Sequence, residues 1–203
     1  MIASSGAVYG EPERFPIGEE DPLRAISPYG ASKLAAEIEA GMFHRVYGLP
    51  VVIARLFNTY GPRMARFVVL DFLRKLERDP DLLEILGSGQ QRRDFNYVAD
   101  TVAALLILGQ RGEPGQAYNV ASGRSCSVLD LAHMMIAALG LTDRTRIVTT
   151  GASWVGDAQR WEVCIEKIAA LGYQPHVSLV EGLARVIEWH GFKPQRPLAE
   201  VVS

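Results

Sequence analysis

Short apolar runs alternate along the chain with stretches of helical periodicity, and this alternation predicts an α/β protein. Residues 1–4 lead into a turn-rich segment and indicate the end of a strand. A helix is expected over 28–47, because Ser27 is a good N-cap, a proline follows it, and Gly48 can close the last turn. Residues 51–57 (VVIARLF) are β-branched and almost continuously apolar. That pattern is typical of a strand covered on both faces of a parallel sheet.

The rest of the chain continues this pattern and contains no internal repeat. Ser127 followed by Asp130 predicts an N-terminal capping box. The stretches at 58–63 and 87–94 are expected to be a turn and a loop, and the tail after 189 is expected to be frayed. The remaining elements expected are helices at 67–78, 100–108, 127–139, 164–171 and 179–189, and extended segments at 82–86, 95–98, 117–121 and 147–149.

Composition narrows the class of protein. The chain has 203 residues, 48% of them hydrophobic, and a formal net charge of −2. No overall positive field would attract nucleic acid or an anionic membrane, and no apolar run is long enough to span a bilayer. The two cysteines, Cys126 and Cys164, have no metal-ligand spacing. We therefore expect thiols in a cytoplasmic protein, with no metal site, no nucleic-acid partner and no membrane partner.

Tyr29 and Lys33 are the first candidates for chemistry. They stand at positions i and i+4 in the first turns of the predicted helix, so both side chains face the carboxyl edge of the sheet, where open α/β sheets bind ligands. An ammonium group about 4 Å from a phenol would stabilise the phenolate by roughly 4 kcal/mol at an effective dielectric near 20. Such a tyrosine could act as a general acid or base. A chain with seven tyrosines and four lysines contains this spacing by chance in about one sequence in seven, so the alternative of a surface pair without a function stays open.

Ser5 and Arg93 are weaker candidates. Ser5 lies in the turn after the first strand, where its hydroxyl could donate to a substrate oxygen, or merely satisfy a backbone turn. Arg93 could clamp a phosphate through paired donors, or be a surface arginine paired with Asp94 or Glu84. The four histidines show no spacing that suggests a triad or a metal site.

Five motifs follow one another through the first 125 residues. They are SSGAVYG (4–10), SPYGASK (27–33), ARLFNTYGPR (54–63), RRDFNYVAD (92–100) and YNVASG (118–123). In kind, order and spacing they closely resemble the extended short-chain dehydrogenase/reductases. Within these, the chain is similar to the NAD-dependent nucleotide-sugar epimerase/dehydratase family, which includes UDP-glucose 4-epimerase-like enzymes. The last third of the chain resembles the family only loosely.

The resemblance implies the fold and its division into lobes. The expected architecture is the carboxyl-terminal part of a Rossmann-type doubly wound parallel sheet, with a smaller mixed α/β lobe that binds substrate. Residues 1–60 and 95–122 would belong to the NAD-binding domain. Residues 61–94 and 123–203 would form the nucleotide-sugar lobe.

The resemblance also implies the reaction. Tyr29 would be the catalytic acid/base, Lys33 would hold the nicotinamide ribose and make the phenol more acidic, and Ser5 would assist at the substrate oxygen. Phe57 would contact the nicotinamide side through its backbone. NAD would accept a hydride from a sugar carbon as Tyr29 removes the hydroxyl proton, and the keto sugar would then be reduced again or processed further. NADP is not excluded as the cofactor.

Substrate binding would fall to a second group of residues. Asn58 would bind a phosphate of the nucleotide-diphosphate sugar, and Arg93 would pair with the diphosphate. The nucleotide base would be lined by Glu84, Ile85 and Leu86. In the family an arginine usually stands two residues before a Gly-Asp pair, whereas this chain has Trp154 there, with Arg160 nearby in another register.

Two features separate this chain from parts of the family. Relatives that eliminate water tend to carry acidic residues after the catalytic hydroxyl, but Ser5 is followed by Gly6 and Ala7. Epimerase or simple oxidoreductase chemistry is therefore favoured over a 4,6-dehydratase, which stays an alternative. The GxxGxxG phosphate loop and the acidic ribose-binding residue of such enzymes are expected to lie outside these 203 residues.

The missing loop leads to further expectations. The chain by itself is expected to bind NAD weakly, to lack turnover and to be marginally soluble, and a non-catalytic remnant or sugar-nucleotide-binding module is the alternative from another class. A homodimer is expected through helices 28–47 and 100–108. The second of these is apolar from Val102 to Leu108, which is more than one buried face requires.

Overall fold

A computed structural model describes residues 1–151 and 158–193, and it confirms the predicted α/β fold with parallel strands. The strands are β1 (Ile2–Ser5), β2 (Ile53–Leu56), β3 (Asn58–Tyr60), β4 (Leu82–Ile85), β5 (Arg92–Tyr97), β6 (Ala117–Val120), β7 (Ser125–Ser127) and β8 (Arg146–Thr149). The helices are α1 (Pro28–Tyr47), α2 (Val68–Arg78), α3 (Val98–Arg111), α4 (Val128–Ala138), α5 (Glu166–Ala169) and α6 (Leu179–His190), with a 3-10 turn, η1 (Gly6–Val8), after β1.

The described residues form two compact units, and each is considered by itself. The first comprises 1–59, 92–126 and 158–177, and the second comprises 60–91, 127–151 and 178–193. The first boundary falls next to the predicted one, but 158–177 belong to the first unit rather than with the other carboxyl-terminal residues. The assignment of one lobe to cofactor and one to substrate stays a prediction.

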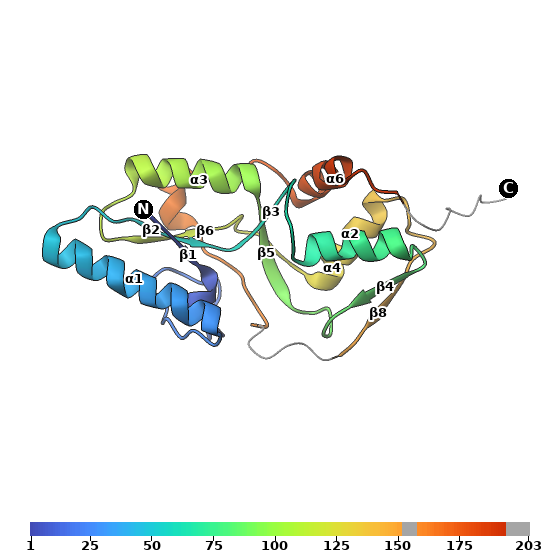
Figure 1. Cartoon of the computed structure of the whole chain (residues 1–203), viewed down its shortest axis with the longest axis horizontal. Coiled ribbons are helices and arrows are strands. Elements are labelled where there is room, and N and C mark those ends of the chain that lie inside the picture. The colour runs from blue at the N-terminus through green and yellow to red at the C-terminus, as the bar shows by residue number, and fades with distance from the viewer. Residues whose placement is uncertain (152–157, 194–203) are drawn as a thin grey trace. The chain divides into compact units, whose positions relative to one another are not determined.

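The first unit is built on a parallel sheet of order β1-β2-β6. Successive residues of β2 point to opposite faces of this sheet. Ala54 packs with Ala104 and Leu108 of α3, whereas Arg55 pairs with Glu37 of α1. Figure 1 accordingly shows α1 and α3 on opposite sides of the sheet.

The ends of α1 are fixed by the residues that the sequence indicated. The backbone N–H of Gly30 donates to Ser27 Oγ at 3.1 Å, and Pro28 occupies the first turn. Gly48 has a φ of 67°, a left-handed conformation that glycine adopts without a steric penalty. The predicted boundaries of α1 are therefore confirmed, and the helix begins close to the carboxyl end of β1.

Several local predictions need correction. The predicted turn at 58–63 begins as the strand β3, and the predicted loop at 87–94 gives way to β5 at Arg92. These strands lie in a second sheet of order β3-β5-β7. The strand β7 was not predicted, because three residues are too few to show an alternation. The segment 164–171 is helical only from Glu166 to Ala169.

The second unit contains the parallel pair β4-β8 together with α2, α4 and α6. The expected capping box of α4 is present: Asp130 N–H donates to Ser127 Oγ at 2.9 Å, and Ser127 N–H donates to Asp130 Oδ2 at 3.0 Å. Among the described residues, no helix combines the length and apolar character needed to cross a membrane. The tail from residue 194 and the position of Trp154 lie outside the described residues.

Candidate active site

The turn after β1 presents Ser5. Its Oγ accepts the backbone N–H of Ala7 at 3.2 Å and caps η1, so the structural role considered for Ser5 is real. No described residue accepts the hydroxyl proton of Ser5, which is therefore available to a ligand. The side chain itself is largely buried. Ser5 can thus be a turn residue and a hydrogen-bond donor at once.

Two close backbone approaches hold the first turn of α1 against this segment. A Cβ at Gly30 would lie 2.5 Å from the carbonyl oxygen of Ala7, and a Cβ at Gly6 would lie 2.4 Å from the ring of Phe57. Both positions therefore require glycine for steric reasons. The turn that follows Ser5 is in this way packed against the residue next to Tyr29.

Tyr29 and Lys33 share one face of α1, as their spacing predicted. Tyr29 is 56% exposed, so its phenol is accessible from solvent. Lys33 Nζ lies 5.9 Å from the centroid of the Tyr29 ring and donates to the carbonyl oxygen of Ala3 in β1 at 3.0 Å. The structure therefore brings Ser5, Tyr29 and Lys33 together where β1 ends and α1 begins.

Phe57 and Asn58 follow the carboxyl end of the neighbouring strand β2. Phe57 is buried and stacks on Tyr9, with ring centroids 6.3 Å apart. Asn58 Nδ2 is buried and has no hydrogen-bond partner among the described residues. A buried amide without a partner is costly, so this donor is suited to a ligand atom.

Arg93 is half-buried in β5 and lies against an aromatic side chain. Its guanidinium carbon is 5.1 Å from the ring centroid of Trp161, and its Nη1 donates to the carbonyl oxygen of Arg92 at 2.8 Å. Trp161 in turn meets the Phe57 ring edge-on, with centroids 5.7 Å apart. The cation–π contact and the hydrogen bond restrain the guanidinium, and a guanidinium can bind a phosphate through two donors. Trp161 could not be singled out from the sequence, because nothing local predicts that it meets Phe57.

The remaining substrate-side candidates belong to other surroundings. Glu84 and Ile85 lie in β4 of the second unit and Leu86 follows them; Ile85 is buried, whereas Glu84 and Leu86 are exposed. Their predicted role at the nucleotide base stays a prediction. Arg160 pairs with Glu162 at 2.8 Å and covers the Phe15 ring at 4.2 Å. The Arg160 guanidinium holds the pKa of the Glu162 carboxyl below its usual value.

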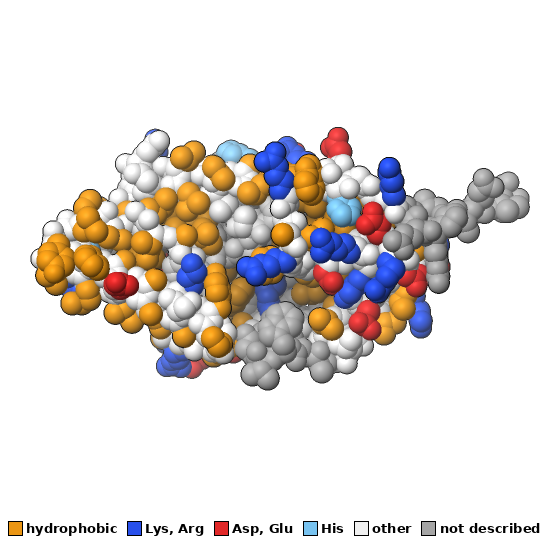
Figure 2. Space-filling view, in the orientation of Figure 1, with side chains coloured by type: hydrophobic (Ala, Val, Ile, Leu, Met, Phe, Trp, Pro, Cys, Tyr) orange, Lys and Arg blue, Asp and Glu red, His pale blue; other side chains and the backbone are white. Residues whose placement is uncertain are grey.

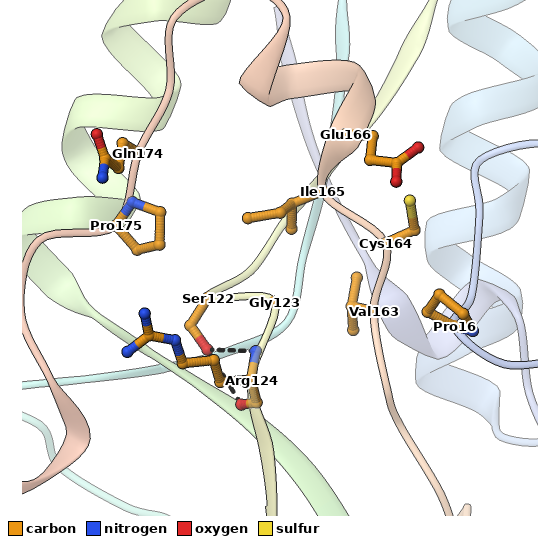
Figure 3. Close-up of a pocket in the computed structure, with 10 residues that line it drawn as sticks. All are labelled: Pro16, Ser122, Gly123, Arg124, Val163, Cys164, Ile165, Glu166, Gln174 and Pro175. Carbon is orange, nitrogen blue, oxygen red and sulfur yellow. Dashed lines mark hydrogen bonds between the residues drawn. The ribbon is translucent and has the colours of Figure 1, made fainter.

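A pocket of about 420 Å³ opens beyond the carboxyl end of β6 (Figure 3). Ser122, Gly123 and Arg124 line one side of it, and Cys164, Ile165 and Glu166 line another. None of the predicted site residues contributes to this pocket. The described residues also hold no group of three or more His, Cys, Asp or Glu side chains placed to bind a metal ion.

The glycine spacing of a dinucleotide loop does occur in this chain, contrary to expectation. Gly109, Gly112 and Gly115 form a Gly-x-x-Gly-x-x-Gly sequence. They end α3 and lead into β6, whereas a phosphate loop leads from a strand into a helix. A Cβ at Gly112 would lie 2.9 Å from the side chain of Val52, so glycine at this position allows the end of α3 to pack closely against Val52.

Comparisons with known proteins show which family this chain resembles. Residues 1–186 match the family model described as GDP-mannose 4,6 dehydratase. The dTDP-D-glucose 4,6-dehydratase of Mus musculus is 34% identical over 195 residues, covering 94% of this chain and 55% of that protein. The UDP-glucose 4-epimerase of Mycolicibacterium smegmatis is 32% identical over 198 residues, covering 95% and 62% respectively.

Solved structures show the same likeness. A crystal structure of UDP-galactose 4-epimerase matches 93% of this chain and 61% of its own, with 32% identity and a TM-score of 0.81. DesIV, the dTDP-glucose 4,6-dehydratase of Streptomyces venezuelae solved with NAD and TYD bound, matches 93% and 58%, with 30% identity and a TM-score of 0.83. RMD from Pseudomonas aeruginosa, solved with NADPH, matches 93% and 65%, with 29% identity and a TM-score of 0.84. The chain spans about three-fifths of the length of these proteins.

Proposed function

We propose, because the chain belongs to the nucleotide-sugar epimerase/dehydratase family of the extended short-chain dehydrogenase/reductases, that it has the function of an epimerase or oxidoreductase. Its substrate is a nucleotide-diphosphate sugar. The reaction proceeds through a transient keto sugar. The observation that supports this most is the grouping of Ser5, Tyr29 and Lys33 at the junction of β1 and α1.

The cofactor of this reaction is NAD, with NADP as the alternative. When bound, it supplies the acceptor for a hydride from the sugar carbon. The residues present fit its nicotinamide half: Lys33 provides a cation at the carboxyl edge of the sheet, and the segment at Phe57 provides backbone beside it. Within residues 1–151 and 158–193, no glycine loop leads from a strand into a helix to bind its phosphates.

The catalytic roles follow from the chemistry of the side chains. Tyr29 removes the proton of the sugar hydroxyl that is oxidised and returns it when the carbonyl is reduced. Lys33 stabilises the phenolate electrostatically and orients the ribose. Ser5 donates its free hydroxyl proton to the same sugar oxygen and keeps that oxygen near Tyr29. The substrate diphosphate is bound by the Asn58 amide and by the Arg93 guanidinium, which lies over the Trp161 ring.

The segment after Ser5 favours epimerase over dehydratase chemistry. Loss of water from the sugar needs a second acid or base beside the tyrosine, and the stretch 4–10 carries no carboxylate. A side chain at Gly6 would also collide with the Phe57 ring, so the position cannot supply one without repacking. The 4,6-dehydratase reaction is the second candidate, since the matching family model bears that name.

The partner of this chain is a second copy, bound through α1. The expected surface combined α1 with α3, which cover opposite faces of the sheet, and that pairing stays a prediction. Ile38, Met42 and Val46 repeat every four residues along α1 and are 60%, 47% and 61% exposed. Figure 2 shows hydrophobic side chains gathered over this helix. A stripe of this kind is suited to a helix-to-helix interface.

The test is turnover with NAD and a set of nucleotide-diphosphate sugars, with products identified by NMR. An epimerase gives the stereoisomer of the substrate, and a dehydratase gives a 4-keto-6-deoxy sugar. In an active protein, Tyr29→Phe lowers kcat at least 1000-fold while KM changes only a few-fold, because only the proton acceptor is lost. Tyr47→Phe, at a 74% exposed position on the same helix, is the matched control. Full turnover by Tyr29→Phe would remove Tyr29 from the mechanism, and sugar binding without any oxidation would indicate a binding module.

A further inference from the structure

A buried ion pair joins α1 to β2. The side chains of Glu37 and Arg55 are 5% and 6% exposed. Arg55 Nη2 donates to Glu37 Oε2 at 2.8 Å, and Arg55 Nε lies 3.1 and 3.2 Å from the two carboxylate oxygens. Well-packed apolar side chains often stabilise a fold as well as such a pair does, because desolvation offsets most of the attraction between the charges. The pair therefore points to a role beyond stability.

The pair is the centre of a larger hydrogen-bond network. Ser4 Oγ donates to Glu37 Oε1. Arg55 Nη1 donates to Tyr9 Oη at 2.8 Å, and Tyr9 Oη donates to Asn119 Oδ1 at 2.8 Å. Burial raises the pKa of Tyr9 well above its ordinary value, so this phenol keeps the proton that it donates. The network thus reaches β1, η1, α1, β2 and β6.

Four members of the network lie near residues of the proposed active site along the chain. Ser4 directly precedes Ser5, and Tyr9 follows it at the end of η1. Glu37 lies one turn beyond Lys33 on the same helix, and Arg55 is two residues before Phe57. A shift of β1, η1 or α1 relative to β2 would have to break a buried hydrogen bond to Glu37 or Arg55.

We propose that Glu37, Arg55, Ser4 and Tyr9 are positioning residues, which hold the Ser5 turn, the Tyr29–Lys33 face of α1 and the carboxyl end of β2 in one fixed arrangement. They touch neither substrate nor cofactor. This inference rests on the proposed function for its effect on turnover. Displacements of about 1 Å at a reacting centre lower rates about 100-fold, so loosening the arrangement acts on kcat more than on KM.

The test compares Ser4→Ala and Tyr9→Phe with a control of similar structural cost. Ser127→Ala removes the buried N-cap hydroxyl of α4 in the second unit and leaves the network intact. For each variant, kcat, KM, Tm and the amide NMR signals of Gly6, Ala7 and Gly30 are measured. The network variants should lower kcat at least 10-fold, change KM less than 3-fold and move the three amide signals. Ser127→Ala should lower Tm and leave kcat, KM and the three amide signals unchanged.

Two outcomes overturn the proposal. One is that Ser4→Ala and Tyr9→Phe lower Tm but leave kcat and the amide signals as they are in the unmodified protein. The other is that Ser127→Ala moves the same amide signals to the same extent. If the 203-residue chain by itself has no turnover, as is expected for it, the amide signals alone decide whether the network holds the Ser5 turn against α1.

Discussion

Asp94 should make the stability of the protein depend on pH in a defined direction. Its side chain is 0% exposed, and its Oδ1 accepts the backbone N–H of Ser122 at 2.7 Å. Its Oδ2 is buried with no hydrogen-bond partner among the described residues. Burial raises the pKa of Asp94 from 3.8 to about 6, although the Ser122 donors oppose this shift.

The magnitude follows from the two pKa values. A difference of this size means that ionising Asp94 costs about 3 kcal/mol more in the folded protein than in the unfolded chain. Because the pKa of Asp94 is higher in the folded state, its protonation favours the folded protein. This contribution to the free energy of unfolding is fully present below the unfolded pKa and is lost as the pH rises through about 6. The protein therefore carries an unfavourable buried carboxylate at neutral pH.

Urea unfolding of the unmodified protein and of Asp94→Asn, followed by tryptophan fluorescence, measures this effect. Asparagine keeps the acceptor for Ser122 but does not ionise, so its stability relative to the unmodified protein should increase by about 2 kcal/mol between pH 4.5 and pH 7.5. Asp143→Asn, at an exposed position, should follow the profile of the unmodified protein. If the difference between Asp94→Asn and the unmodified protein is the same at both pH values, the argument from burial is refuted.

Three other predictions concern binding, packing and assembly. Arg93→Ala should raise the KM for the nucleotide sugar, corresponding to a loss of binding free energy on the order of 2 kcal/mol. An unchanged KM would show that Arg93 has a structural role. Gly30→Ala should lower the free energy of unfolding by about 1–3 kcal/mol, because the new Cβ meets the carbonyl oxygen of Ala7. Gly41→Ala, where a Cβ would have nothing within 4 Å, should raise the free energy of unfolding by about 0.5–1 kcal/mol. Equal effects of the two substitutions in urea unfolding would contradict this prediction. Ile38→Glu should convert a dimer to a monomer in sedimentation equilibrium, and a monomeric unmodified protein would refute the α1 interface.

The sequence alone determined the parts of this protein that depend on neighbouring residues. The N-cap and C-cap of α1, at Ser27 and Gly48, and the capping box of α4 are local hydrogen-bond patterns, so they could be predicted. The apolar run around β2 predicted a strand covered on both faces, and both faces are covered. The order of the motifs was sufficient to indicate the family, and the i, i+4 spacing of Tyr29 and Lys33 placed them on one helical face.

Tertiary structure decided which distant residues meet. Tyr9 and Asn119 are 110 positions apart and share a hydrogen bond, and Glu37 and Arg55, 18 positions apart, form a buried ion pair that no local pattern indicates. The placement of α1 and α3 on opposite faces was equally hidden, since each helix taken by itself shows an apolar surface. Periodicity reports whether a position is buried, but it does not report what buries it. The identity of the buried partner depends on how the strands order themselves in the sheet, and that order is set by contacts between segments that lie far apart in the sequence.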